Sequence, residues 1–314
     1  GELAHSTNIR LPPGYGDGVI NTAAYSWQWM AATYRMLERY YTKNGLPLSE
    51  DLTYPLAERH EITRTPGLLD PAYKELYGYM QPGAETIQLY LDREPRFYAN
   101  LGITGGYWRA HTVRINTMMY AGADGGYNSS THATDFLNTG IGIQKLVHPE
   151  SQSNAWQRVI RYPYPMMRMA DLYLMKAEAL NEYSGPSQEV YDAINLVRRR
   201  AGIPDLEAVW SDPTLARTVN KHQTKEGLRD IILQERSVEF AFEGHRFWDM
   251  WRHKRAVAEF SSPVWGWTHT GATAQTFFVL EVKQARRFTI TDHLWPIDLD
   301  ELNTNGNLIQ NPGW

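Results

Sequence analysis

The hydrophobic and polar positions between residues 161 and 204 predict two antiparallel helices joined by a short turn. In the first helix, apolar residues recur at helical spacing and are expected to form one buried face: Met169, Leu172, Tyr173, Ala177 and Leu180. Asp171, Glu178 and Glu182 fall on the opposite side, which we expect to face solvent. Gly185, followed by a proline, ends this helix.

The second helix of the pair carries start and stop signals at both ends. Ser187 can cap it, and the acidic Glu189 in its first turn suits the positive end of the helix dipole. Its apolar stripe is expected to be buried: Val190, Ala193, Ile194, Val197 and Ala201. Gly202 can adopt the left-handed stop and Pro204 prevents continuation, so a helical hairpin is predicted.

The rest of the chain alternates between helical, extended and irregular patterns. Helices are predicted at 23–41, 71–80, 85–97, 225–242 and 245–252, with a helical turn at 299–303. Strands are predicted at 99–103, 108–120, 141–147, 277–283 and 286–290. Residues 121–139 are rich in Gly, Asn, Ser and Thr and are predicted to form a long loop, while 206–218 are expected to be irregular.

The hairpin has the length of the helix pairs that stack into tetratricopeptide-like arrays. The predicted fold class is therefore mainly α, with tetratricopeptide-like helix pairs and a loop-rich part that contains a few short β-strands. We divide the chain into a loop-rich part at 1–160 and a helical part with the C-terminal tail at 161–314.

The composition excludes several classes of function. A net charge of −4 gives no basic footprint for nucleic acid, and no run of 18 apolar residues could span a bilayer. The absence of cysteine excludes disulfides and thiolate chemistry. The ten histidines show no compact ligand spacing, so no metal and no cofactor are predicted. Asp124 and Asn128 could donate oxygens to calcium, but an ordinary turn explains them as well.

One carboxylate pair is compatible with catalysis. Glu235 and Glu239 lie four residues apart on a predicted helix, which puts their β-carbons roughly 6 Å apart. Retaining glycosidases hold two carboxyl groups about 5 Å apart, so a glycoside hydrolase is one alternative. Because the helix has a broad apolar face, we favour structural ion pairs with Arg236 and Arg246, and no catalytic residue is predicted.

Six aromatic residues sit beside Gly, Ser, Asn or Thr instead of at core spacing. We predict that they form a ligand-binding surface: Trp108, Tyr127, Trp265, Trp267, Tyr107 and Trp156. An exposed aromatic face can stack on a sugar ring while neighbouring polar groups bond the hydroxyls. As a set they favour a glycan ligand.

Several segments in a fixed order resemble the SusD/RagB family of outer-membrane nutrient-binding lipoproteins. They are DREPRFYAN at 92–100, RYP at 161–163 before LYLMKAEA at 172–179, INLVR at 194–198, QER at 234–236, FEGHRFWD at 242–249, LWPI at 294–297 and NPG at 311–313. Together they span most of residues 90–314.

The resemblance implies a mostly helical protein on the outer face of a Gram-negative outer membrane. Such a protein binds glycans without catalysis and passes them to a SusC-like TonB-dependent transporter. It also implies that 1–314 is a C-terminal portion, whose upstream helices, signal peptide and lipid-anchored cysteine are missing. Two alternatives stay open: a peptide or other nutrient as the ligand, and a subunit whose main role is to contact the transporter.

Overall fold

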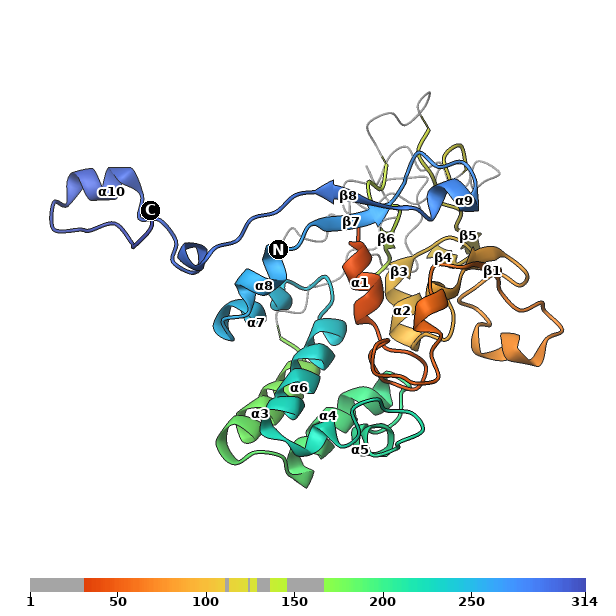
Figure 1. Cartoon of the computed structure of the whole chain (residues 1–314), viewed down its shortest axis with the longest axis horizontal. Helices are drawn as coiled ribbons and strands as arrows, with labels where there is room; N and C mark the ends of the chain where they lie inside the picture. The colour runs from red at the N-terminus through yellow and green to blue at the C-terminus, as the bar shows by residue number, and fades with distance from the viewer. Residues whose placement is uncertain (1–30, 111–112, 124, 129–135, 146–166) are drawn as a thin grey trace.

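The computed structural model describes residues 31–110, 113–123, 125–128, 136–145 and 167–314 (Figure 1). Its α-helices are α1 (Tyr34–Arg39), α2 (Pro95–Asn100), α3 (Met169–Ser184), α4 (Gln188–Arg200), α5 (Leu206–Trp210), α6 (Lys225–Glu239), α7 (His245–Arg252), α8 (Ala256–Phe260), α9 (Ala274–Phe277) and α10 (Leu299–Thr304). Short 3₁₀ turns are η4 (Leu56–Glu58), η5 (Pro71–Glu75), η6 (Gln88–Tyr90), η8 (Lys221–Gln223) and η9 (Ile290–His293).

The strands described form antiparallel two-stranded pairs. They are β1 (Ile62–Arg64) with β2 (Glu85–Ile87), β3 (Leu101–Gly102) with β6 (Gly142–Ile143), β4 (Tyr107–Ala110) with β5 (Val113–Asn116), and β7 (Val264–Trp267) with β8 (Leu280–Gln284). The prediction of a mainly helical fold with a few short strands is confirmed.

The helical hairpin forms where it was predicted, as α3 and α4. Gly185 follows α3 with a φ of 82°, and Gly202 follows α4 with a φ of 76°, a conformation that side chains with a Cβ rarely adopt. All of the predicted stripe of α4 is buried. Ser187 occupies the N-cap position of α4 but makes no side-chain cap hydrogen bond.

The predicted buried face of α3 is only partly right, since Ala177 is buried and Tyr173 and Leu180 pack against the core, whereas its other members do not. Met169 is 57% exposed and Leu172 is 45% exposed, whereas Asp171 and Glu178 are buried. Contacts with α7 explain the difference: the carboxylate of Glu178 bonds Arg252 and His253, which satisfies its charge away from water. The face that packs inward is centred instead on Ala170, Leu174, Ala177 and Asn181.

The helical part has its own core, in which α3 packs against α4 and α6 (Figure 1). Thr224 caps α6 as predicted, accepting a hydrogen bond from the Gly227 N–H at 3.1 Å. The helix ends at Glu239 rather than at 242, and Phe242 has a positive φ of 67°. The core is completed by α5, which lies in a segment that was wrongly predicted to be irregular.

The loop-rich part has a separate core built largely from aromatic side chains. It gathers residues from 32 to 143, Trp267 of β7, residues 274–278, and Val238 and Ala241 from the helical part, so distant parts of the sequence meet here. The helix predicted at 85–97 is wrong: the segment forms β2 and η6, and α2 starts at Pro95, whose fixed φ suits the first helical position. Of the helix predicted at 23–41, residues 31–41 are described, and α1 occupies only 34–39 of them.

The C-terminal segment leaves the body of the molecule after β8 and ends beyond α10 (Figure 1). The strand predicted at 286–290 does not form, although the helical turn near 299–303 does. Trp295 of this segment stacks on Trp251 of α7, with ring centroids 5.9 Å apart. These contacts attach the segment to the helical part rather than to the aromatic core.

Candidate ligand-binding surface

Trp108 and Trp267, two of the six predicted ligand-binding aromatics, lie in the core. Trp108 is 1% exposed and Trp267 is 0% exposed, so neither offers a ring face to a ligand. The Nε1 of Trp267 donates to the Tyr90 hydroxyl at 2.7 Å, which satisfies its polar atom inside the core. Trp108 and Trp267 lie on β4 and β7, and their burial contradicts the expectation that their rings face a ligand.

Glycine at the β3–β6 pair makes room for Trp108. A Cβ added at Gly102 would lie 2.6 Å from the indole ring, and one added at Gly142 would lie 3.0 Å from it. Gly102 and Gly142 are therefore the glycines that let the Trp108 ring be buried, and they do not belong to a loop that exposes the ring. From the sequence, glycine close to Trp108 predicts an exposed ring, but in this strand pair glycine accompanies a buried one.

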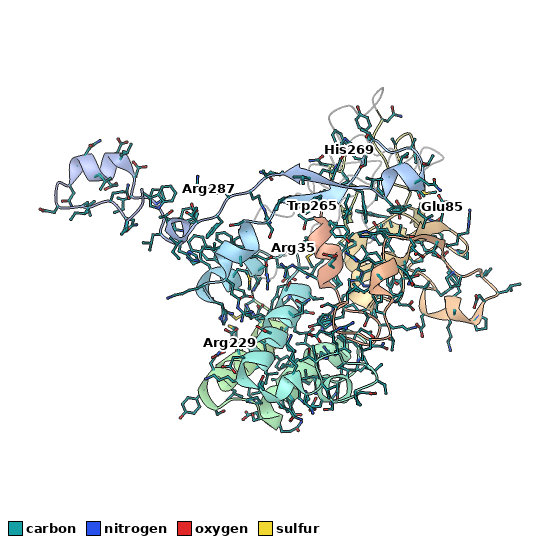
Figure 2. The ribbon with its side chains drawn as sticks, viewed as in Figure 1. Arg35, Glu85, Arg229, Trp265, His269 and Arg287 are labelled. Carbon is teal, nitrogen blue, oxygen red and sulfur yellow. The ribbon has the colours of Figure 1, made fainter. Side chains whose placement is uncertain are left out.

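Trp265 is exposed on the strand that carries Trp267. It is 40% exposed, and its partner in the β7–β8 register, Val282, is 49% exposed. The register shifts between Val264 and Trp265, so the strand is irregular where the ring emerges. Figure 2 labels Trp265 on this strand. Trp265 thus offers the accessible ring that the sequence predicted.

Tyr127 belongs to an aromatic cluster that the sequence did not reveal. Its ring centroid lies 5.0 Å from that of Phe136 and 5.4 Å from that of His269. Phe136 and His269 stack on one another at 4.5 Å and 14°. His269 follows β7 and is labelled in Figure 2. We name Tyr127, Phe136 and His269 the aromatic cluster.

Burial and a neighbouring lysine determine the protonation of His269 in this cluster. The Nζ of Lys283 lies 3.0 Å from the Nδ1 of His269 and also contacts Glu281. Burial and the positive charge of Lys283 lower the pKa of His269, so its ring is neutral and Nδ1 accepts the hydrogen bond. The cluster therefore combines apolar ring surface with a fixed polar pair at its edge.

The last two predicted residues add less to this surface. Tyr107 is partly buried on β4, where its backbone N–H donates to the Tyr79 carbonyl at 2.8 Å. Trp156 lies outside the described residues. Phe136, His269 and Lys283 were missed because they are separated in the sequence: the β7–β8 pair brings Lys283 to His269, whereas Phe136 comes from a distant segment of the chain.

Glu235 and Glu239, the alternative catalytic pair, are structural. Glu235 is 0% exposed and Glu239 is 3% exposed, so a sugar bond cannot reach them. Arg96 binds both, at 2.8 and 3.0 Å. The predicted partners were wrong: Arg236 binds Asp249 at 2.8 Å, and Arg246 binds Glu259 at 3.1 Å.

These two carboxylates belong to a larger set of charges at the boundary between the two parts of the molecule. We name it the junction network: Glu94, Arg96, Lys145, Arg168, Arg198, Arg200, Glu235, Glu239 and Glu243. Burial alone would raise the pKa of Glu239, but the hydrogen bond and charge of Arg168 hold it below its usual value. The Glu239 carboxylate is thus held ionised by fixed cations, and Glu235 is paired with Arg96 and Arg198.

Metal binding and membrane spanning have no support in the described residues. Across the ranges given above, no three His, Asp or Glu side chains are grouped closely enough to hold a metal ion. Asp124, part of the calcium alternative, lies outside them. No helix in the described part of the chain is long and apolar enough to cross a bilayer.

Comparison with known proteins decides the family. The model of the SusD family matches residues 4–314. The chain belongs to the SusD family. SusD-like protein P2 of Formosa agariphila is 34% identical over 152 residues, which are 48% of this chain and 26% of that protein. SusD-like protein P38 of the same organism is 36% identical over 103 residues, or 33% of this chain and 19% of that protein.

Solved structures of SusD-like proteins share the fold. BT4246 is 26% identical with a TM-score of 0.76, and the match covers 100% of this chain and 49% of that one. A SusD-like protein from Bacteroides fragilis is 22% identical with a TM-score of 0.64, over 98% of this chain and 51% of that one. This chain therefore spans about half the length of these two SusD-like structures.

Proposed function

We propose that this protein binds a glycan at the cell surface and passes it to a SusC-like TonB-dependent transporter in the outer membrane. Membership of the SusD family, whose members are surface-associated glycan-binding proteins, supports the proposal. The lipid anchor expected for the full-length protein and the transporter partnership belong to this proposal as well.

The observation that carries the glycan assignment is the exposed ring of Trp265, on the strand that leads to the aromatic cluster. An aromatic face that water reaches stacks well on the C–H face of a pyranose, and Glu281 on the paired strand keeps a carboxylate side chain that is 41% exposed. From the original six residues, Trp265, Tyr127 and Tyr107 remain proposed ligand contacts, together with Trp156. Trp108 and Trp267 are excluded from the site by their burial.

The test uses two tryptophans that lie two residues apart. After a glycan array or affinity gel identifies a ligand, we expect Trp265→Ala to weaken its binding by about tenfold, or roughly 1.4 kcal/mol, with little change in stability. Trp267→Ala removes a core ring and should lower the free energy of unfolding by about 3–5 kcal/mol. Calorimetric titration and urea unfolding measure the two effects.

Each outcome bears on the site. Unchanged affinity in Trp265→Ala and in Tyr127→Ala would refute the proposed surface. If the protein bound no glycan in a broad panel, the assignment of a glycan ligand would be refuted. The next experiments would then be a screen of peptides and co-purification with the transporter.

A further inference from the structure

Three arginines converge on a single glutamate between α1 and α7–α8. Arg35 and Arg39 of α1 both contact the Glu259 carboxylate, the former at 3.3 Å. Arg246 of α7 reaches it from the other side at 3.1 Å. We name these four residues the Glu259 cluster. Three positive charges face one negative charge, which leaves two positive charges unbalanced among these four residues.

Neighbouring charges do not supply the missing balance. The basic side chains around the cluster each have their own acidic partner: Arg59 with Glu38 at 3.4 Å, Arg255 with Asp230 at 2.7 Å, and Lys221 with Glu50 at 3.4 Å. Arg286 brings a fourth guanidinium, which donates to the Ser262 carbonyl at 2.8 Å and to the Glu259 carbonyl at 3.5 Å. The excess of positive charge is therefore local to this cluster.

The protonation of the cluster reflects this excess. Burial and the nearby charge of Arg246 lower the pKa of Arg39 to about 10. Burial also lowers the pKa of Arg246 and of Arg286, and Arg35 adds repulsion to both. Glu259, surrounded by guanidinium groups, has a pKa of about 2 despite its burial. A further anion would relieve repulsion among groups that the fold already holds together.

A cavity of about 410 Å³ adjoins the cluster. Its charged lining consists of Arg35, Arg39, Arg59, Glu38 and Glu259, so three basic side chains face two acidic ones. A second cavity of about 260 Å³ shares Gln234, Pro47 and Ser49 with the first and is lined by Arg246. The volume of the first falls within the range of roughly 300–1,000 Å³ that small-ligand sites occupy.

Donor groups at the cluster are only partly used. The Nε of Arg246 is buried and has no hydrogen-bond partner in the part of the chain that the structure describes. Arg35 has a side chain that is 43% exposed, so it stands at the entrance, whereas that of Arg39 is 13% exposed. Figure 2 labels Arg35 on α1, near the middle of the molecule. Guanidinium groups in fixed positions are well suited to the paired oxygens of an oxyanion.

We propose that the Glu259 cluster and the adjoining cavity bind an oxyanion, either a carboxylate or a sulfate group. Such a group can come from a free inorganic anion or from an acidic sugar unit, such as a uronic acid or a sulfate ester. The site is separate from Trp265 and the aromatic cluster, so it stands whether or not those residues bind a glycan.

Calorimetric titration of the purified protein at fixed ionic strength tests the site. Sodium sulfate and sodium glucuronate are the probes, with sodium acetate as the simple carboxylate and glucose as the neutral control. We expect saturable binding of sulfate or glucuronate and none of glucose. If glucuronate binds at least tenfold more tightly than acetate, the site recognises an acidic sugar. If glucuronate and acetate bind equally, the site recognises the anionic group alone.

Two variants with opposite expected effects make the test specific. Arg35→Gln should weaken anion binding roughly tenfold, the usual consequence of losing one hydrogen bond to a charged group. Glu259→Gln removes the competing carboxylate and should tighten binding. Arg199→Gln is the matched control, because it removes one arginine from an ion pair with Asp205 elsewhere on the surface, and it should leave binding unchanged.

Three results would overturn the proposal. They are the absence of saturable binding by both sulfate and glucuronate, equal weakening in Arg35→Gln and Arg199→Gln, and weaker anion binding in Glu259→Gln that is correctly folded. Because Arg35 is partly exposed, its variant keeps the proposal testable even if Glu259→Gln fails to fold.

Discussion

The junction network and the Glu259 cluster both bury arginines, but they differ in how the charges are matched. In the network, five basic side chains meet four carboxylates, and Arg96 alone binds Glu94, Glu235 and Glu239. In the cluster, three arginines share Glu259. The near-balanced set joins two parts of the fold, whereas the unbalanced set adjoins a cavity. Arginine burial by itself therefore does not distinguish the two sets, whereas the number of carboxylates per arginine does.

The largest effect should follow the loss of Arg96. Arg96→Met leaves Glu94 and Glu235, both 0% exposed, without their main cationic partner. Breaking a buried ion pair from one side typically costs about 3–5 kcal/mol, and we expect a loss of that size in the free energy of unfolding. Urea unfolding at neutral pH measures it. A change below about 1 kcal/mol would mean that the junction network tolerates unpaired charge. The junction network and the Glu259 cluster would then not differ in the way described above.

An intermediate effect is expected on acidification of the cluster. The pKa of Glu259 in the folded protein is about 2, below its ordinary value of 4.5, so its ionised form stabilises the fold. This contribution is complete above pH 4.5 and is lost as the pH falls toward 2. After a discount for partial exposure, it amounts to about 2 kcal/mol.

The pH dependence can be isolated by comparison with Glu259→Gln. Other carboxylates, including Glu239 and Glu243, also have lowered pKa values and contribute to acid sensitivity in both proteins. The difference between wild type and variant should therefore shrink as the pH falls from 4.5 to 2. A constant difference across that window, measured by denaturant unfolding, would show that Glu259 does not titrate in this way.

The smallest effect should follow Arg35→Gln in the absence of added anion. This change removes the contacts of Arg35 with the Glu259 carboxylate, the Glu259 carbonyl and the Ser262 hydroxyl, but it also relieves repulsion from Arg39 and Arg246. Stability should therefore change by less than about 1 kcal/mol. Thermal or urea unfolding compares it directly with Arg96→Met. If the two variants lose equal stability, the cluster is as tightly balanced as the network and our distinction is wrong.

The parts of the fold that the sequence predicted are those with local signals. Gly185 and Gly202 end their helices, and Thr224 begins α6, because each acts on the backbone within one turn. The buried face of α3 could not be predicted in the same way. Glu178 turns inward because Arg252, 74 positions later, neutralises it there and His253, 75 positions later, shares a hydrogen bond with it.

Prediction of the ligand-binding residues was limited in the same way as prediction of the fold. Composition around Trp265 and Trp267 is alike, yet one ring is exposed and the other is buried, because only the second one packs on Tyr34 and Tyr90. Exposure of an aromatic residue depends on tertiary neighbours that the local pattern does not contain. The Glu259 cluster was missed for a related reason, since Arg35 and Glu259 meet only after the chain has folded.

The junction network also constrains when the molecule can finish folding. Arg96 lies 139 positions before Glu235 and 143 before Glu239. During synthesis, α2 therefore leaves the ribosome long before the acidic residues that complete its contacts. Until α6 emerges, Glu94 is the one network carboxylate available to Arg96, so the loop-rich part cannot reach its final packing ahead of the helical part. A chain interrupted before α6 would present unsatisfied charge where the finished protein has an interior.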